Sequence, residues 1–163
     1  DFAEATLVTD SAQLPAAVGA AGVVEVARPV EAATLVVAAG VRVQGGGGAA
    51  PLALGAVLAR GPVEICDATI VGAAQRVEVH GQVLFRNCRF VNCAVVVAGD
   101  VVLERCSLRA EPGFSWAHAL RVQGDARLRL RGTRVMNLVS GSLVPGGSLE
   151  WDADSRLFPF VSG

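Results

Sequence analysis

The stretch VEICDATI (63–70) recurs three times without a gap, as VLFRNCRF (83–90), VVLERCSL (101–108) and LRLRGTRV (128–135). Hydrophobic side chains hold the first, third and eighth positions of all four copies. Smaller side chains hold the sixth position: Ala68, Cys88, Cys106 and Thr133. Positions one and three alternate as in a β-strand, positions six and eight do so again, and the phase slips by one residue between them. We therefore expect each copy to be two short strands joined by a bend.

A third short strand precedes three of the copies, as VEV (77–79), VVV (95–97) and LRV (120–122). A glycine follows each of these strands or, for the first copy, stands in the same place: Gly81, Gly99, Gly124 and Gly61. Glycine there permits the positive φ that tight corners require. The copies begin 20, 18 and 27 residues apart. A repeat of about 20 residues with three strands is typical of a β-helix, whose equivalent residues stack about 4.8 Å apart.

The fold class predicted from this repeat is all-β: a right-handed parallel β-helix of about five to six rungs. We expect residues 1–163 to form one domain, with coils over 23–157. The longest spacing between copies predicts a loop extruded at 111–118.

A short capping helix is predicted over 11–21, SAQLPAAVGAA. Asp10 or Ser11 is suited to cap its beginning. Pro15 falls near the start, where proline is best tolerated. Leu14 and Val18 lie four residues apart and would face the first rung. A helix placed there covers the open apolar end that every solenoid has.

A resemblance follows from the order of these elements. A short helix, a GVVEV strand (22–26), a VRVQG strand (41–45) and coils with Asn or Cys columns are together similar to pectin-lyase-like β-helix proteins. The resemblance covers nearly the whole chain and implies the fold. It implies no single activity, because enzymes, phage tailspikes and assembly subunits share this solenoid.

The enzymes of this group imply aspartates for Ca²⁺ with a nearby basic residue, or two or three aspartates on neighbouring rungs. Here the outward carboxylates are scattered. Glu104 lies between Arg86 and Arg131 in one column, which predicts an ion ladder, and Asp100 and Asp125 follow turn glycines as corner residues. We therefore assign no catalytic residue, no metal ligand and no cofactor.

The four cysteines form no CxxC pair, so a zinc site is not indicated. Cys88 and Cys106 fall in the inward column, where we expect buried free thiols. A bridge between them is the alternative, because stacked rungs bring Cα atoms within disulfide range. Cys66 and Cys93 have no evident partner.

The predicted partner-binding residues are apolar side chains that the pattern places outside the coil. Leu84, Val96 and Val102 are outward on the middle rungs, and a contiguous apolar group often marks an interface. Phe114 and Trp116 in the extruded loop either contact a partner or glycan, or fold back over a rung.

Non-catalytic interaction is therefore the expected function: a structural subunit that docks laterally onto other protein subunits in a larger assembly. One alternative is a carbohydrate-active enzyme of the lyase or hydrolase type. The other is a glycan-binding viral or phage spike module.

Composition bounds these interpretations. Of 163 residues, 52% are hydrophobic and 18% charged, which is typical of a folded domain. The net charge of −1 gives no basic surface for nucleic acid. No apolar run reaches the roughly 18 residues of a membrane span. The chain begins with Asp1, consistent with a processed or trimmed start, so a secreted, organellar or virion location stays open.

Overall fold

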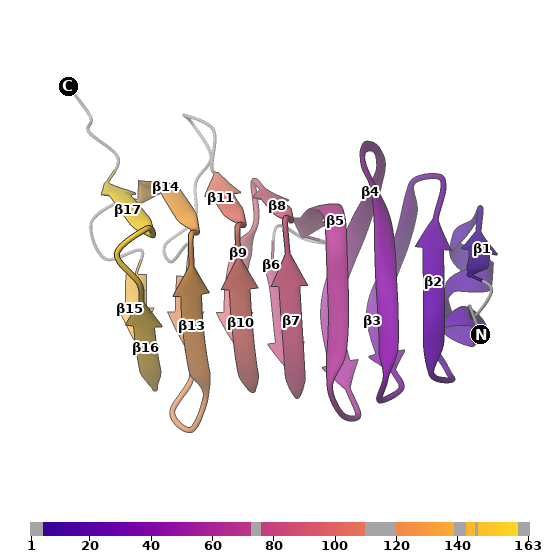
Figure 1. Ribbon diagram of the computed structural model, residues 1–163, viewed down its shortest axis with the longest axis horizontal. Helices are drawn as coiled ribbons and strands as arrows, with labels where there is room; N and C mark the ends of the chain where they lie inside the picture. Colours follow the sequence, from indigo (N-terminus) through magenta and orange to yellow (C-terminus); the bar gives the residue numbers. More distant parts are fainter. Residues whose placement is uncertain (1–4, 73–75, 110–119, 139–142, 146, 160–163) are drawn as a thin grey trace.

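The computed structural model describes residues 5–72, 76–109, 120–138, 143–145 and 147–159 (Figure 1). Its strands pair in parallel and wind into a β-solenoid of about six turns. The predicted parallel β-helix is therefore confirmed.

Three faces make up the solenoid, and we call them A, B and C. Face A, which Figure 1 views from the front, contains β1 (Thr6–Val8), β2 (Gly22–Val26), the starts of β4 (Val41–Ala59) and β5 (Val63–Gly72), β7 (Gln82–Arg86), β10 (Asp100–Glu104), β13 (Arg127–Arg131) and β16 (Ser148–Trp151).

Faces B and C carry the rest of each turn. Face B contains the start of β3 (Val30–Val37), the middle of β4, the end of β5, β8 (Arg89–Val91), β11 (Ser107–Arg109), β14 (Arg134–Leu138) and β17 (Arg156–Pro159). Face C contains the ends of β3 and β4, β6 (Arg76–His80), β9 (Ala94–Val97), β12 (Leu120–Val122) and β15 (Leu143–Pro145).

The four eight-residue copies stack in the register that their alignment predicts. Their first residues pair in the order Val63, Val83, Val101, Leu128, and their eighth residues in the order Ile70, Phe90, Leu108, Val135. All eight of these side chains are buried. The apolar columns therefore form one continuous core along the coil.

The predicted bend between the two strands is one residue in the left-handed conformation. The fifth residue of each copy has a φ of 54° or 55°: Asp67, Asn87, Arg105 and Gly132. Glycine, Asn and Asp adopt this conformation most readily. Arg105 is therefore the exception in this column.

Side chains in the sixth column donate hydrogen bonds to backbone carbonyl oxygens inside the coil. The Cys88 and Cys106 thiols each donate to a carbonyl oxygen of the preceding rung, at 3.3 Å, and the Thr133 hydroxyl does the same at 2.7 Å. All four cysteines are buried free thiols, as expected for Cys88 and Cys106. Burial raises the pKa of Cys93 to about 12, so this thiol stays protonated.

The N-terminal cap is confirmed but is shorter than predicted. A 3₁₀ turn (Ser11–Gln13) leads into α1 (Leu14–Ala17), and Asp10 caps the turn by accepting the Gln13 N–H at 3.2 Å. Leu14 and Val18 are fully buried, and α1 packs against β1 and β3. The helix ends before 21 because the chain passes through Gly19 and then turns into β2.

Two of the four corner glycines have a different cause from the one predicted. Of the four, only Gly81 has a positive φ, at 89°. Gly61 and Gly99 are instead required by close stacking. A Cβ at Gly61 would lie 2.5 Å from the Ala39 Cβ, and one at Gly99 would overlap the Gly81 carbonyl oxygen.

Candidate functional site

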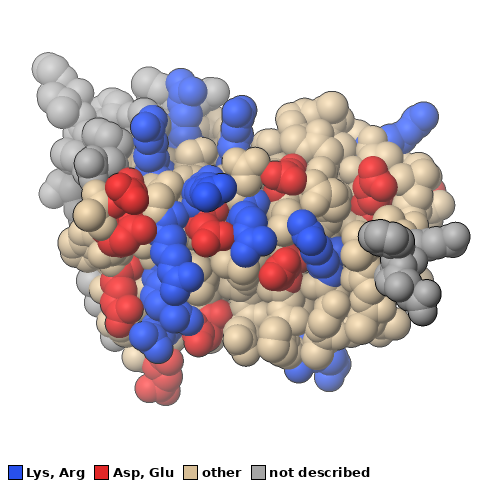
Figure 2. Space-filling view, in the orientation of Figure 1, with Lys and Arg blue, Asp and Glu red and all other residues tan. Residues whose placement is uncertain are grey.

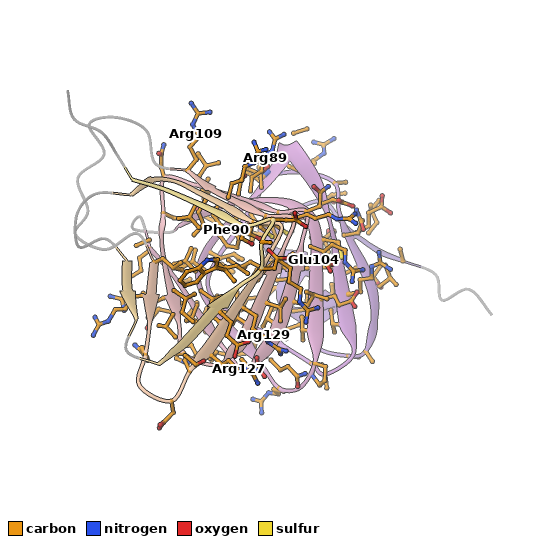
Figure 3. All side chains as sticks on the ribbon, turned by 60° about the vertical axis from the view of Figure 1, so that its left-hand side comes forward. Arg89, Phe90, Glu104, Arg109, Arg127 and Arg129 are labelled. Atoms are coloured by element: carbon orange, nitrogen blue, oxygen red, sulfur yellow. The ribbon has the colours of Figure 1, made fainter. Side chains whose placement is uncertain are left out.

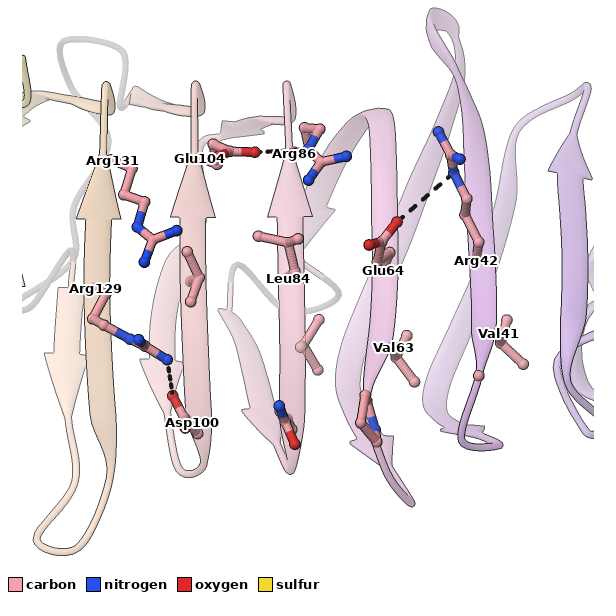
Figure 4. Close-up of a pocket in the computed structure, with 15 residues that line it drawn as sticks. Val41, Arg42, Val63, Glu64, Leu84, Arg86, Asp100, Glu104, Arg129 and Arg131 are labelled. Carbon is pink, nitrogen blue, oxygen red and sulfur yellow. Dashed lines mark hydrogen bonds and ion pairs between the residues drawn. The ribbon is translucent and has the colours of Figure 1, made fainter.

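A groove on face A runs across the middle rungs of the coil. It has a volume of about 540 Å³ and lies over the starts of β4 and β5 and over β7, β10 and β13 (Figure 4). Leu84 and Val102 pair with each other across β7 and β10, and their partly exposed side chains form an apolar floor.

Three ion pairs surround this floor. Arg42 Nε lies 3.9 Å from Glu64 Oε2, Arg86 Nε lies 2.7 Å from Glu104 Oε2, and Arg129 Nη2 lies 3.3 Å from Asp100 Oδ1 (Figure 4). The predicted ion ladder at Glu104 is thus formed with Arg86. The carboxylates of the groove are held by arginines rather than by one another.

The β13 end of the groove carries excess positive charge. The strand has the sequence RLRLR, and Figure 2 shows a band of basic side chains over it. Arg129 Nε is buried and has no hydrogen-bond partner, although its Nη2 reaches Asp100. Arg131 is exposed and forms no ion pair with the described residues. This end of the groove is therefore complementary to a carboxylate.

Other ionisable side chains are engaged individually. Hydrogen bonds from Gln44 and Asn87 lower the pKa of Asp67, and hydrogen bonds from Ser155 and the Gly132 N–H lower that of Asp152. Both carboxylates are therefore stabilised in the ionised form. Within the described ranges, no three His, Cys, Asp or Glu side chains come together where they could hold a metal ion.

The structure brings together two of the predicted partner-binding residues and separates a third. Leu84 and Val102 are neighbours in the groove. Val96 lies on face C, between Glu78 and Arg121, and is only 5% exposed. Its expected place on an exposed docking face is therefore wrong, because alternation fixes only that a side chain points outward, not that it stays uncovered. Phe114 and Trp116 lie outside the described residues.

Arg129 and Arg131 line the same end of the groove, and neither was predicted as a site residue. The signal was present in the alignment, because Arg129 follows Leu84 and Val102 in the second column and Arg131 follows Arg86 and Glu104 in the fourth. The column pattern alone does not show which arginine forms an ion pair with each carboxylate.

Comparison with known proteins adds no further assignment. No protein-family model matches the chain, and neither a curated protein nor a solved structure matches it significantly. No helix among the described residues is both long and apolar enough to cross a membrane.

Proposed function

We propose that the chain is a non-catalytic interaction module that docks laterally, through the groove on face A, onto an extended segment of another protein subunit. The observation that carries this proposal is the apolar floor of Leu84 and Val102 beside the positive charge of Arg129 and Arg131. Such a site fits an apolar side chain and a carboxylate presented together.

The stacking of the rungs sets the spacing of those two groups. Leu84, Val102 and Arg129 stand in one column on three successive rungs, about 4.8 Å apart. The middle of the apolar floor is therefore about 7 Å from the arginine. An extended segment running along the coil axis rises about 3.3 Å per residue, so the carboxylate stands two residues from the apolar residue, at i+2 or i−2 according to the direction of the segment. Residues i and i+2 also share one face of an extended chain, so both reach the groove.

The relation to the pectin-lyase-like group is part of this proposal. The short helix over the first rung, the three strands per turn and the inward Cys column support it. Such a relation would leave the activity open, because the function depends on the site rather than on the coil.

The proposal can be tested with a displayed library of random peptides. We expect selection on the wild-type protein to enrich sequences in which Asp or Glu stands two residues from a large apolar residue. The double variant Leu84→Asp, Val102→Asp should bind these peptides at least tenfold more weakly, because it places carboxylates on an apolar contact surface.

Two further variants make this test specific. Val36→Asp is the matched control, because Val36 is an exposed valine on face C, at 39% exposure. It should bind as the wild type does. Arg129→Gln should remove the preference for the acidic residue while keeping the apolar one. Selected peptides that lack this pattern, or that bind the double variant equally well, would refute the proposal.

A further inference from the structure

A second cluster of charge lies on face B, away from the groove. Ser107 on β11 pairs with Arg89 on β8 on one side and with Arg134 on β14 on the other. Arg105 and Arg109 stand two residues before and after Ser107 on its own rung. Four arginines thus surround one hydroxyl. We propose that these five residues form a binding site for a tetrahedral oxyanion, a phosphate or sulfate group.

The spacing of the site follows from the coil. Arg89 and Arg134 start about 4.8 Å above and below Ser107, and Arg109 starts about 6.6 Å further along the same strand. Arg105 stands at the left-handed corner just before this strand. All four arginines are exposed and Ser107 is partly exposed. Figure 3 shows Arg89 and Arg109 extending from the same side of the coil. The long side chains can therefore converge over the Ser107 hydroxyl.

The charge of the cluster is not neutralised by the described part of the protein. None of the four arginines forms an ion pair there, and the Ser107 hydroxyl makes no hydrogen bond there.

The neighbouring carboxylates are each engaged elsewhere. Asp67 accepts from the Gln44 and Asn87 amides at 2.6 and 2.7 Å, and Glu104 is paired with Arg86 on face A. Asp152 accepts from the Ser155 hydroxyl and the Gly132 N–H. Four like charges brought together repel one another, and a bound dianion would offset that repulsion.

The backbone at Arg105 adds an independent observation. In the other three aligned rungs this corner is occupied by Asp67, Asn87 or Gly132, which tolerate a left-handed conformation. Arginine tolerates it less well. The rung that contains Ser107 is the one that places a cation at this corner despite the strain.

The donor set favours a tetrahedral anion over a carboxylate. Each guanidinium presents a planar fork that matches two oxygens of a phosphate or carboxylate. The register of the sheet and the corner at Arg105 place four such forks around one hydroxyl. A carboxylate has only two oxygens in one plane, whereas a phosphate or sulfate group directs three or four oxygens toward different donors.

The site can be tested by NMR titration of the protein with sodium phosphate and sodium sulfate, with chloride adjusted to hold the ionic strength constant. We expect saturable shifts at the amides of Ser107 and its arginine neighbours. Arg89→Gln and Arg134→Gln should each weaken binding by about twofold to fivefold, the range of exposed charge pairs, and the double variant by more than either.

Arg60→Gln is the matched control, because Arg60 is an exposed arginine beyond the end of β4, at the opposite corner. It should leave binding unchanged. A phosphate monoester and a sulfate monoester are titrated side by side. The one that gives saturable shifts at the same amides identifies which of the two groups the site binds. Non-saturable shifts spread over all arginines, or an equal loss in Arg60→Gln, would show general attraction of anions and overturn the proposal. Circular dichroism shows whether each variant keeps the fold.

Discussion

Replacing Arg105 with Asn is expected to stabilise the protein. The left-handed conformation costs an ordinary residue about 1–2 kcal/mol, and Asn adopts it more readily. The Arg105 N–H donates to the Arg131 carbonyl oxygen at 2.7 Å, and this bond belongs to the backbone and stays. The arginine side chain makes no ion pair with the described residues, so the change removes strain without removing an ion pair.

The expected gain is about 0.5–1 kcal/mol, about half of the strain, because Asn still prefers other conformations. For a chain of this size it corresponds to a rise in melting temperature of about 1–4 °C. Urea unfolding is the direct assay, with the midpoint shifted and the m-value unchanged. An Arg105→Asn variant no more stable than the wild type would refute the reasoning.

Charge is the competing explanation, because the same substitution relieves repulsion among arginines. Arg109→Asn separates the two causes, since it removes the same charge from a regular strand beyond the corner. We expect it to gain nothing, within about 0.5 kcal/mol. An equal gain in both variants would assign the effect to repulsion rather than to the backbone.

Four further outcomes follow from the core, the corners and the ladder. Phe85→Ala should lower the free energy of unfolding by about 3–5 kcal/mol, because its ring is fully buried; urea unfolding measures this. Gly99→Ala should destabilise by about 1–3 kcal/mol in the same assay, since the methyl group would overlap the carbonyl oxygen of the preceding corner. Thr133→Val should cost about 1–3 kcal/mol by leaving a buried carbonyl without its donor, and Thr133→Ser should cost less. Because the pKa of Asp67 is lowered on folding, its stabilisation is present above about pH 4 and is lost as the pH falls through the folded pKa; Asp67→Asn should flatten that part of a melting-temperature profile.

The architecture was readable from the sequence because the same columns repeat. Phe85 and Leu103 occupy the same place in aligned copies, and a slip of one residue would turn either side chain out of the core. Only one register of successive rungs therefore keeps both side chains in the core. Leu84 and Val102 were found for the same reason, as outward residues of one column.

The parts that were missed depend on what surrounds a side chain. Alternation places Val96 outward, but its 5% exposure comes from other parts of the molecule that cover it. The helix end at Ala17 depends on where the chain must turn toward β2, not on the propensities of the alanines that follow. The charge at Arg131 depends on Glu104 pairing with Arg86 instead, and the two arginines look equivalent in the sequence.

The strain at Arg105 can persist because an unfavourable conformation in a solenoid destabilises only the rungs next to it. Each rung contacts only its two neighbours, so an unfavourable corner weakens one rung and its interfaces without disturbing the rest of the coil. The core residues of that rung, Val101, Leu103 and Leu108, are almost fully buried and offset the cost. The same substitution, Arg105→Asn, should then stabilise the coil while it weakens oxyanion binding on face B. An arginine that served the structure alone would not show these opposite effects, because its removal would change stability and leave phosphate affinity as it was.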